Sequence, residues 1–124
     1  MKNLSYIMLL SISMSFNAVA CYDKKVTDKV NFANCEIHAK QGDANAQYNL
    51  GVMYHKGEGT TQDYREALKW YEKAAEQGHA SAQLNISMFY FTGKGTNQDL
   101  NDALKWYKKA VAQGRAGAQY NLGL

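Results

Sequence analysis

The 124-residue sequence contains no proline, only two cysteines and no long run of one charge. Because proline is absent, the ten glycines are the main helix-breaking residues, which favours helices separated by glycine turns. The formal net charge is only +3, with basic and acidic residues interleaved, and no aromatic-rich basic motif occurs. This composition argues against nucleic acid as a partner.

Sequence motifs for catalysis and metal binding are also missing. No serine is followed three residues later by lysine, as the nucleophile motif of β-lactamases requires. The three histidines, His38, His55 and His79, do not have the spacing of metal ligands. We therefore expect no catalytic residue, no cofactor and no metal site, and we predict that the chain is not an enzyme.

The first 20 residues have the pattern of a secretory signal peptide. Lys2 supplies a positive charge, residues 4–16 are apolar and rich in serine, and Ala18-Val19-Ala20 is a cleavage signal of the Ala-x-Ala type. The apolar run is shorter than the roughly 20 residues that a membrane-spanning helix needs. We therefore predict an exported protein, periplasmic or secreted, whose mature chain begins at Cys21.

Cys21 allows two alternatives. Ala18-Val19-Ala20-Cys21 resembles a bacterial lipobox, in which Cys21 would be lipidated and would anchor the protein to a membrane. If Cys21 is not lipidated, the oxidising compartment allows a disulfide between Cys21 and Cys35, and a buried free thiol at Cys35 is the alternative. The sequence leaves both alternatives open, and a membrane is a partner only in the first.

A gapless repeat of 36 residues organises the rest of the chain. Residues 42–77 and 78–113 are identical at 19 of 36 positions, and residues 114–123 match the start of the first copy at eight of ten. A weaker half-repeat precedes them. Periods of this length indicate stacked repeats rather than a closed globule. The predicted organisation is a signal peptide (1–20), an N-terminal half-repeat or cap (21–41), two complete repeats (42–77 and 78–113) and a partial third repeat (114–124).

Each complete repeat is predicted to contain a first-type helix, a glycine turn and a second-type helix. In the first repeat the helices are expected at residues 44–55 and 64–77, and another second-type helix at residues 28–41. Asp63 has the features of an N-cap, with Glu66 completing a capping box. Gly51 is small enough for a neighbouring helix to approach closely.

The repeated pattern resembles a known family. Ala-x-Ala-Gln-x-x-Leu-Gly-x-x-Tyr, then Gly-x-Gly, Asp and Ala-x-x-Trp-Tyr-x-Lys-Ala-Ala-x-Gln-Gly is similar to the Sel1-like repeat. The resemblance implies an all-α, right-handed α-solenoid of the tetratricopeptide type, and a bacterial exported scaffold that binds another protein or peptide. Cysteine-rich relatives described as β-lactamases suggest a periplasmic or peptidoglycan-related hydrolase as the alternative, but this chain lacks their cysteine pair in each repeat.

Positions that differ between the copies indicate where a partner would bind. Along the first-type helices these positions recur every three or four residues and so form one helical face, here called the apolar stripe. The resemblance places this face in the concave groove of the solenoid, and its apolar character predicts a partner site. The alternative is that these residues pack between adjacent first-type helices. The apolar stripe consists of Asn45, Tyr48, Val52, His55, Ser81, Leu84, Met88 and Phe91.

The third copy stops within a first-type helix, and no second-type helix follows it. Helical solenoids need a polar element on the terminal repeat. We therefore expect weak self-association through the C-terminal end. A truncated copy of a longer repeat protein is a further alternative.

Overall fold

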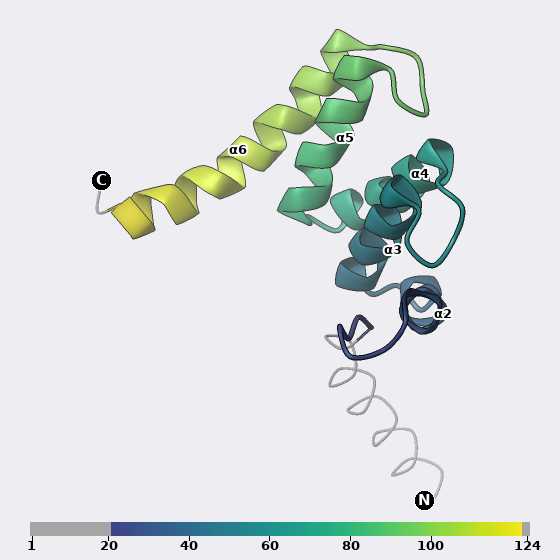
Figure 1. Cartoon of the computed structure of the whole chain (residues 1–124). Coiled ribbons are helices and arrows are strands. Elements are labelled where there is room, and N and C mark those ends of the chain that lie inside the picture. The colour runs from purple at the N-terminus through teal and green to yellow at the C-terminus, as the bar shows by residue number, and fades with distance from the viewer. Residues whose placement is uncertain (1–20, 123–124) are drawn as a thin grey trace, which may run out of the picture.

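The computed structural model describes residues 21–122, with side chains placed as far as Gly114, so the predicted signal peptide lies outside the described residues. Within this range the chain forms five helices and no strand (Figure 1). The predicted all-α repeat architecture is confirmed, and helix ends agree with the predicted ends to within one residue up to α5. The helices are α2 (Asp28–Lys40), α3 (Ala44–Lys56), α4 (Tyr64–Glu76), α5 (Ala80–Thr92) and α6 (Leu100–Leu122).

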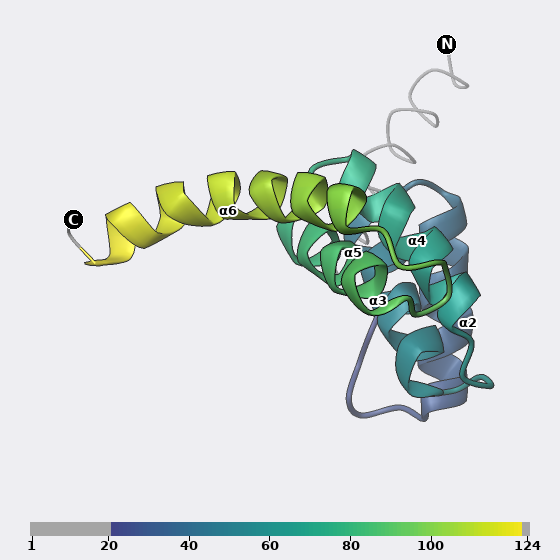
Figure 2. The same cartoon turned by 90° about the horizontal axis from the view of Figure 1, so that it is seen from above.

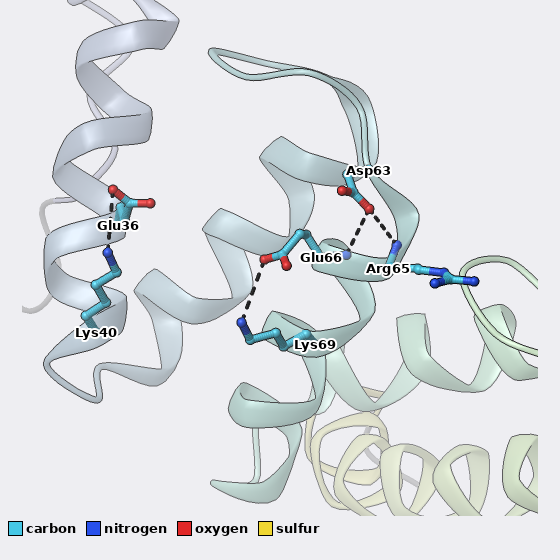
Figure 3. A network of polar contacts seen from close by, with 6 residues as sticks. All are labelled: Glu36, Lys40, Asp63, Arg65, Glu66 and Lys69. Atoms are coloured by element: carbon cyan, nitrogen blue, oxygen red, sulfur yellow. Dashed lines mark hydrogen bonds and ion pairs between the residues drawn. The ribbon is translucent and has the colours of Figure 1, made fainter.

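Side chains that accept hydrogen bonds begin these helices. Asp63 caps α4, because its Oδ1 atom accepts from the backbone N–H groups of Arg65 at 3.0 Å and Glu66 at 3.1 Å (Figure 3). The reciprocal half of the predicted capping box is not formed. The Asp63 N–H donates to the Tyr54 carbonyl instead, and the Glu66 carboxylate lies 3.9 Å from Lys69 Nζ. This N–H bond ties the start of α4 to the end of α3.

The glycine turns between the helices of each repeat are set by contact with the previous repeat. Gly57 and Gly93 end α3 and α5 in the left-handed conformation, with φ of 75° and 77°. Gly95 has φ of 67°, and a Cβ atom there would lie 2.6 Å from the Tyr64 carbonyl oxygen. Gly59 lies in the same way against the start of α2. These turns therefore require glycine both for conformation and for close packing.

Each helix packs mainly on its neighbours in sequence, and the interior consists of two clusters. One cluster joins the N-terminal segment, α2, α3 and Trp70 of α4. The second joins α4 to α5 and includes Tyr71, Ile86 and Phe89, all almost completely buried. The second cluster carries residues of both complete repeats, so neither repeat buries its apolar face alone.

A recurring glutamine contact fixes how successive helices align. Gln47 Nε2 donates to the Ala39 carbonyl at 3.1 Å, and Gln83 Nε2 donates to the Ala75 carbonyl at 3.2 Å. Gln77 Nε2 then donates to Gln47 Oε1, and Gln113 Nε2 to Gln83 Oε1, both at 2.8 Å. Because Gln47 and Gln83 are buried, these bonds satisfy amide groups that would otherwise destabilise the fold.

The last described helix differs from the predicted repeat boundary. α6 continues through Gly114 to Leu122, where the repeat predicts a turn like those at Gly42 and Gly78. Those two glycines precede Asp43 and His79, whose side chains cap the next helix, whereas Arg115 follows Gly114 and its side chain type has no acceptor. The end of α6 therefore extends beyond the body of the stack in both views (Figures 1 and 2). None of the five described helices combines the length and apolar composition needed to cross a membrane.

Candidate functional site

The apolar stripe predicted from the sequence does not form one continuous exposed groove. Three of its four members on α3, which are Tyr48, Val52 and His55, are half-buried and pack against the interior cluster. Its apolar members on α5 are exposed. The two copies of the same helical face therefore have different surroundings, and the alternative of packing between helices applies to the first repeat.

Aromatic contacts hold the α3 members in place. The Tyr48 ring stacks on the His79 ring, with centroids 4.5 Å apart. The His55 ring meets Phe89 edge to face at 5.0 Å, and its Nδ1 atom lies 3.3 Å from the Tyr71 hydroxyl. Because His79 and Phe89 belong to the second repeat, it is the second repeat that covers this face of the first. Burial lowers the pKa of His55, as do the nearby Lys94 and Lys56 charges, so the ring is neutral at pH 7.

The apolar α5 members of the stripe border an open groove of about 720 Å³ between α5 and α6, here called the end groove. Leu84, Met88 and Phe91 are 42%, 57% and 61% exposed. Asn45 and Ser81, the first members of the stripe on each helix, are exposed but do not line this groove. The end groove is lined by Leu84, Ser87, Met88, Phe91, Thr92, Leu100, Ala103, Leu104 and Tyr107.

Comparison with the first repeat shows why the end groove is apolar. Leu68 is 7% exposed and Tyr71 is fully buried, because α5 packs over them through Ile86 and Phe89. Their equivalents one repeat later, Leu104 and Tyr107, are both 51% exposed. Among the described residues, nothing covers α6 as α5 covers α4. The end groove is thus the second copy of a surface that is occupied in the first.

Six of the nine residues that line the end groove were not among the predicted site residues, and three of these six are large apolar side chains. Leu100, Leu104 and Tyr107 lie on α6, a second-type helix, whereas the prediction considered only first-type helices. The sequence does carry a signal for them. Leu104 and Tyr107 repeat Leu68 and Tyr71 without change, and a side chain suited to burial is exposed if no following repeat packs on it.

The opposite end of the stack is closed. A disulfide joins Cys21 to Cys35, with Cα atoms 4.6 Å apart, and both residues are buried. Asn31, which replaces the alanine of the complete repeats, is also buried and exchanges two hydrogen bonds with the Asp23 backbone, at 2.8 and 2.9 Å. Asn49 Nδ2 lies 3.3 Å from Cys21 Sγ. The segment before α2 therefore covers the N-terminal end of the interior.

Two further titratable side chains, His79 and Tyr90, make hydrogen bonds within the fold. His79 caps α5, since its Nδ1 atom accepts from the Ala82 N–H at 3.2 Å, and burial lowers the pKa of this histidine. Tyr90 donates to Glu72 at 3.1 Å, and burial together with the Glu72 charge raises the pKa of Tyr90 to about 12. No group of three or more histidine, cysteine or acidic side chains that could hold a metal ion occurs in the part of the chain that the structure describes.

Comparison with known families matches residues 44–79 and 80–114 to the Sel1 repeat, which together are more than half of the chain. A sel1-like repeat-containing protein of Acanthamoeba polyphaga mimivirus is 48% identical over 42 residues, which are 34% of this chain and 7% of that protein. The chain thus spans a small part of this curated relative.

Solved structures share the fold. A protective antigen of uropathogenic Escherichia coli with an SLR fold is 38% identical, with a TM-score of 0.70 over 79% of this chain and 22% of the antigen. A Sel1 repeat protein from Oxalobacter formigenes is also 38% identical, with a TM-score of 0.70 over 78% of this chain and 40% of that protein. Cysteine rich protein B of Helicobacter pylori is 20% identical with a TM-score of 0.73, covering 85% and 88% of the two chains, and shows likeness of fold alone.

Proposed function

Because this chain belongs to the Sel1-repeat family, whose members are helical-repeat scaffolds, we propose that it is an exported scaffold that binds a helical segment of a protein partner in the end groove. One observation carries the proposal. The end groove is an open, apolar copy of a surface that binds a helix, α5, in the preceding repeat. The α5 half of the predicted apolar stripe contributes to this site, while the α3 half is already occupied.

The occupied copy indicates the chemistry of the partner. On α5, the residues that face α4 are Ala82, Ile86 and Phe89, spaced by four and three residues along one helical face. A small residue at the first position lets the helix backbone approach closely, and the two larger ones fill the space between the helices. The proposed partner segment is therefore an amphipathic helix with this pattern. Exposed apolar surface bordered by polar residues is typical of such sites.

Export is supported by the N-terminal pattern and by the cysteine pair. Residues 1–20 have the arrangement of a signal peptide, and the Cys21–Cys35 disulfide is a bond that persists in oxidising compartments. A lipid on Cys21 would occupy the sulfur atom that forms this bond, so disulfide and lipidation are alternatives for one molecule. We favour the disulfide and a periplasmic or secreted protein without a membrane anchor.

A peptide-binding experiment tests the groove. A labelled peptide with the sequence of residues 79–92 is titrated with the chain of residues 21–124, and fluorescence anisotropy follows binding. We expect saturable binding that is weakened at least about tenfold by Met88→Asp or Leu104→Asp. Ile37→Asp is the matched control, because Ile37 on α2 is 55% exposed and lies far from the end groove in sequence. Absence of binding, or equal loss in the control, would contradict the proposal.

Mass spectrometry tests export. The protein is expressed with residues 1–124 in a bacterial host, and the envelope and cytoplasmic fractions are separated. We expect an N-terminus at Cys21 in the exported fraction, with a mass two hydrogens lower than that of the reduced chain. A lipid mass on Cys21 would instead support the anchored alternative, and an uncleaved cytoplasmic chain would refute export.

A further inference from the structure

We infer that the end groove accepts residues 116–122 of a second copy of this chain, so that two copies exchange their C-terminal segments. This inference rests on the proposed function of the end groove and names its partner. It combines three features of the chain. The end groove is not filled by any residue whose side chain the structure describes. Residues 116–122 repeat four of the seven residues at 80–86 of α5, the helix that fills the equivalent surface one repeat earlier. At Gly114 the helix continues instead of turning.

The segment after Gly114 continues the repeat. Ala118, Gln119 and Leu122 stand one period after Ala82, Gln83 and Ile86, and the first two pairs are identical. Ala82, Gln83 and Ile86 are the α5 residues that lie buried against α4 or bond to its Ala75 carbonyl. A segment with the same pattern, placed in the end groove, would meet α6 residues that are themselves copies of the α4 residues. The groove and the segment are therefore complementary by the same chemistry that joins α4 to α5.

The segment does not lie in the groove of its own chain. α6 is one helix from Leu100 to Leu122, so the eight residues after Gly114 extend about 12 Å further along the helix axis, at 1.5 Å per residue. Both views show this end of α6 directed away from α5 (Figures 1 and 2). In this arrangement the segment is presented to another molecule.

Arg115 explains why the exchange is favoured over folding back. The turns at Gly42 and Gly78 are each followed by an N-cap, with Asp43 accepting from Ala46 and His79 accepting from Ala82. An arginine side chain has five donors and no acceptor, so it cannot cap a helix that begins after Gly114. Exchange of an identical element between protomers is a low-cost route to dimers. The continuous helix at Gly114 leaves the segment free of its own groove, as such an exchange requires.

Sedimentation velocity of the chain of residues 21–124, from about 5 µM to about 500 µM, tests the inference. We expect a monomer–dimer equilibrium. Met88→Asp places a charge in the end groove, and Leu122→Asp places a charge in the segment that enters it. Each substitution should weaken dimerisation at least about tenfold. Mixed together, the two variants should form a heterodimer, because one intact groove and one intact segment remain. Ile37→Asp should dimerise like the unchanged chain. A strict monomer, or a dimer insensitive to Leu122→Asp, would overturn the inference.

Arg115→Asp gives an independent test that leaves both contact surfaces unchanged. An aspartate after Gly114 supplies the missing N-cap, so the segment should fold back into its own groove. We expect a monomer, with reduced binding of the residue 79–92 peptide. A dimer as tight as that of the unchanged chain would refute the exchange. The peptide titration separates the two proposals, since peptide binding by a strictly monomeric chain would preserve the proposed function and overturn only the exchange.

Discussion

The two complete repeats share 19 of 36 residues, yet the same side chains are interior in one and surface in the other. Tyr71 is fully buried under α5, whereas Tyr107, its identical copy, is about half exposed. The difference arises from position in the stack, because the first repeat has a neighbour on both sides and the second has one only on its N-terminal side among the described residues. Whether a side chain is buried therefore depends on whether a neighbouring repeat packs over it. This is expected for a solenoid, whose stability is a sum of the stabilities of its repeats and of the interfaces between them.

Removing the two equivalent tryptophans should give the largest contrast. Trp70 is buried in the N-terminal cluster, whereas Trp106 is only partly buried at the edge of the second cluster. We expect Trp70→Ala to lower the free energy of unfolding by about 3 to 5 kcal/mol, and Trp106→Ala by clearly less. Urea denaturation followed by circular dichroism measures both. Equal losses would show that the two repeats are equally covered in solution.

Removing the disulfide should weaken the closed end and leave the open end unchanged. Cys21 and Cys35 are 14 residues apart, and closure of a loop of about this length contributes about 3 kcal/mol in the chain-entropy model. The Cys21→Ser/Cys35→Ser variant should therefore melt at a lower temperature, with a similar loss for the unchanged chain under reducing conditions. Affinity for the residue 79–92 peptide at 10 °C should stay the same. A parallel loss of affinity would indicate that the two ends are coupled.

Exchanging one small residue between repeats sharpens the comparison further. A Cβ atom at Gly51 would lie 2.6 Å from the Tyr71 ring, so Gly51→Ser overpacks the interior and should destabilise by about 1 to 3 kcal/mol. Ser87 occupies the equivalent place beside the exposed Tyr107. Ser87→Gly should cost only the usual penalty of glycine in a helix, roughly 0.5 to 1 kcal/mol. Thermal melts of the two variants provide the measurement, and a larger loss for Ser87→Gly would contradict this account.

The pH dependence should show the smallest effect. Burial, together with Lys94 and Lys56, lowers the folded-state pKa of His55 below its ordinary value of 6.5, so the unfolded chain binds more protons as the pH falls. The stabilisation from neutral His55 is complete above about pH 6.5 and is lost as the pH decreases toward the folded pKa. His55→Phe introduces the residue found at Phe91 and should flatten this part of the profile. His79, whose pKa is also lowered, should account for the slope that remains. An unchanged slope would mean that His55 does not contribute.

Much of the fold could be predicted because its determinants are local. The period, the glycines and Asp63 fixed the helices to within one residue as far as α5, and the small size of Gly51 is indeed matched by the Tyr71 ring that lies over it. The reciprocal half of the capping box could not be foreseen, since the Asp63 N–H bonds to Tyr54 in the preceding helix. That choice depends on how two helices pack, which the spacing of Asp63 and Glu66 does not encode.

The candidate site was harder to predict for the same reason. The pattern along α3 and α5 identified a helical face, but two nearly identical patterns cannot indicate which copy is covered. Tyr48, Val52 and His55 are packed because α5 follows them, and Met88 is exposed because α6 continues through Gly114 without a turn. A local signal for that continuation exists at Arg115, where the two earlier boundaries have Asp43 and His79. Comparing the capping residue at every boundary, in addition to the glycine, would have revealed it.

The glutamine hydrogen bonds can form with any number of repeats, but they require every repeat to keep the same length. Gln47 and Gln77 are 30 residues apart, as are Gln83 and Gln113, and each pair makes the same bond. A gene that gains or loses a complete 36-residue block preserves every one of these spacings, whereas a single inserted codon between Gln47 and Gln77 disrupts one of them. Duplication of whole blocks is thus a change that selection can accept in one step. Proteins of very different lengths can arise from this one block without any alteration of its interior.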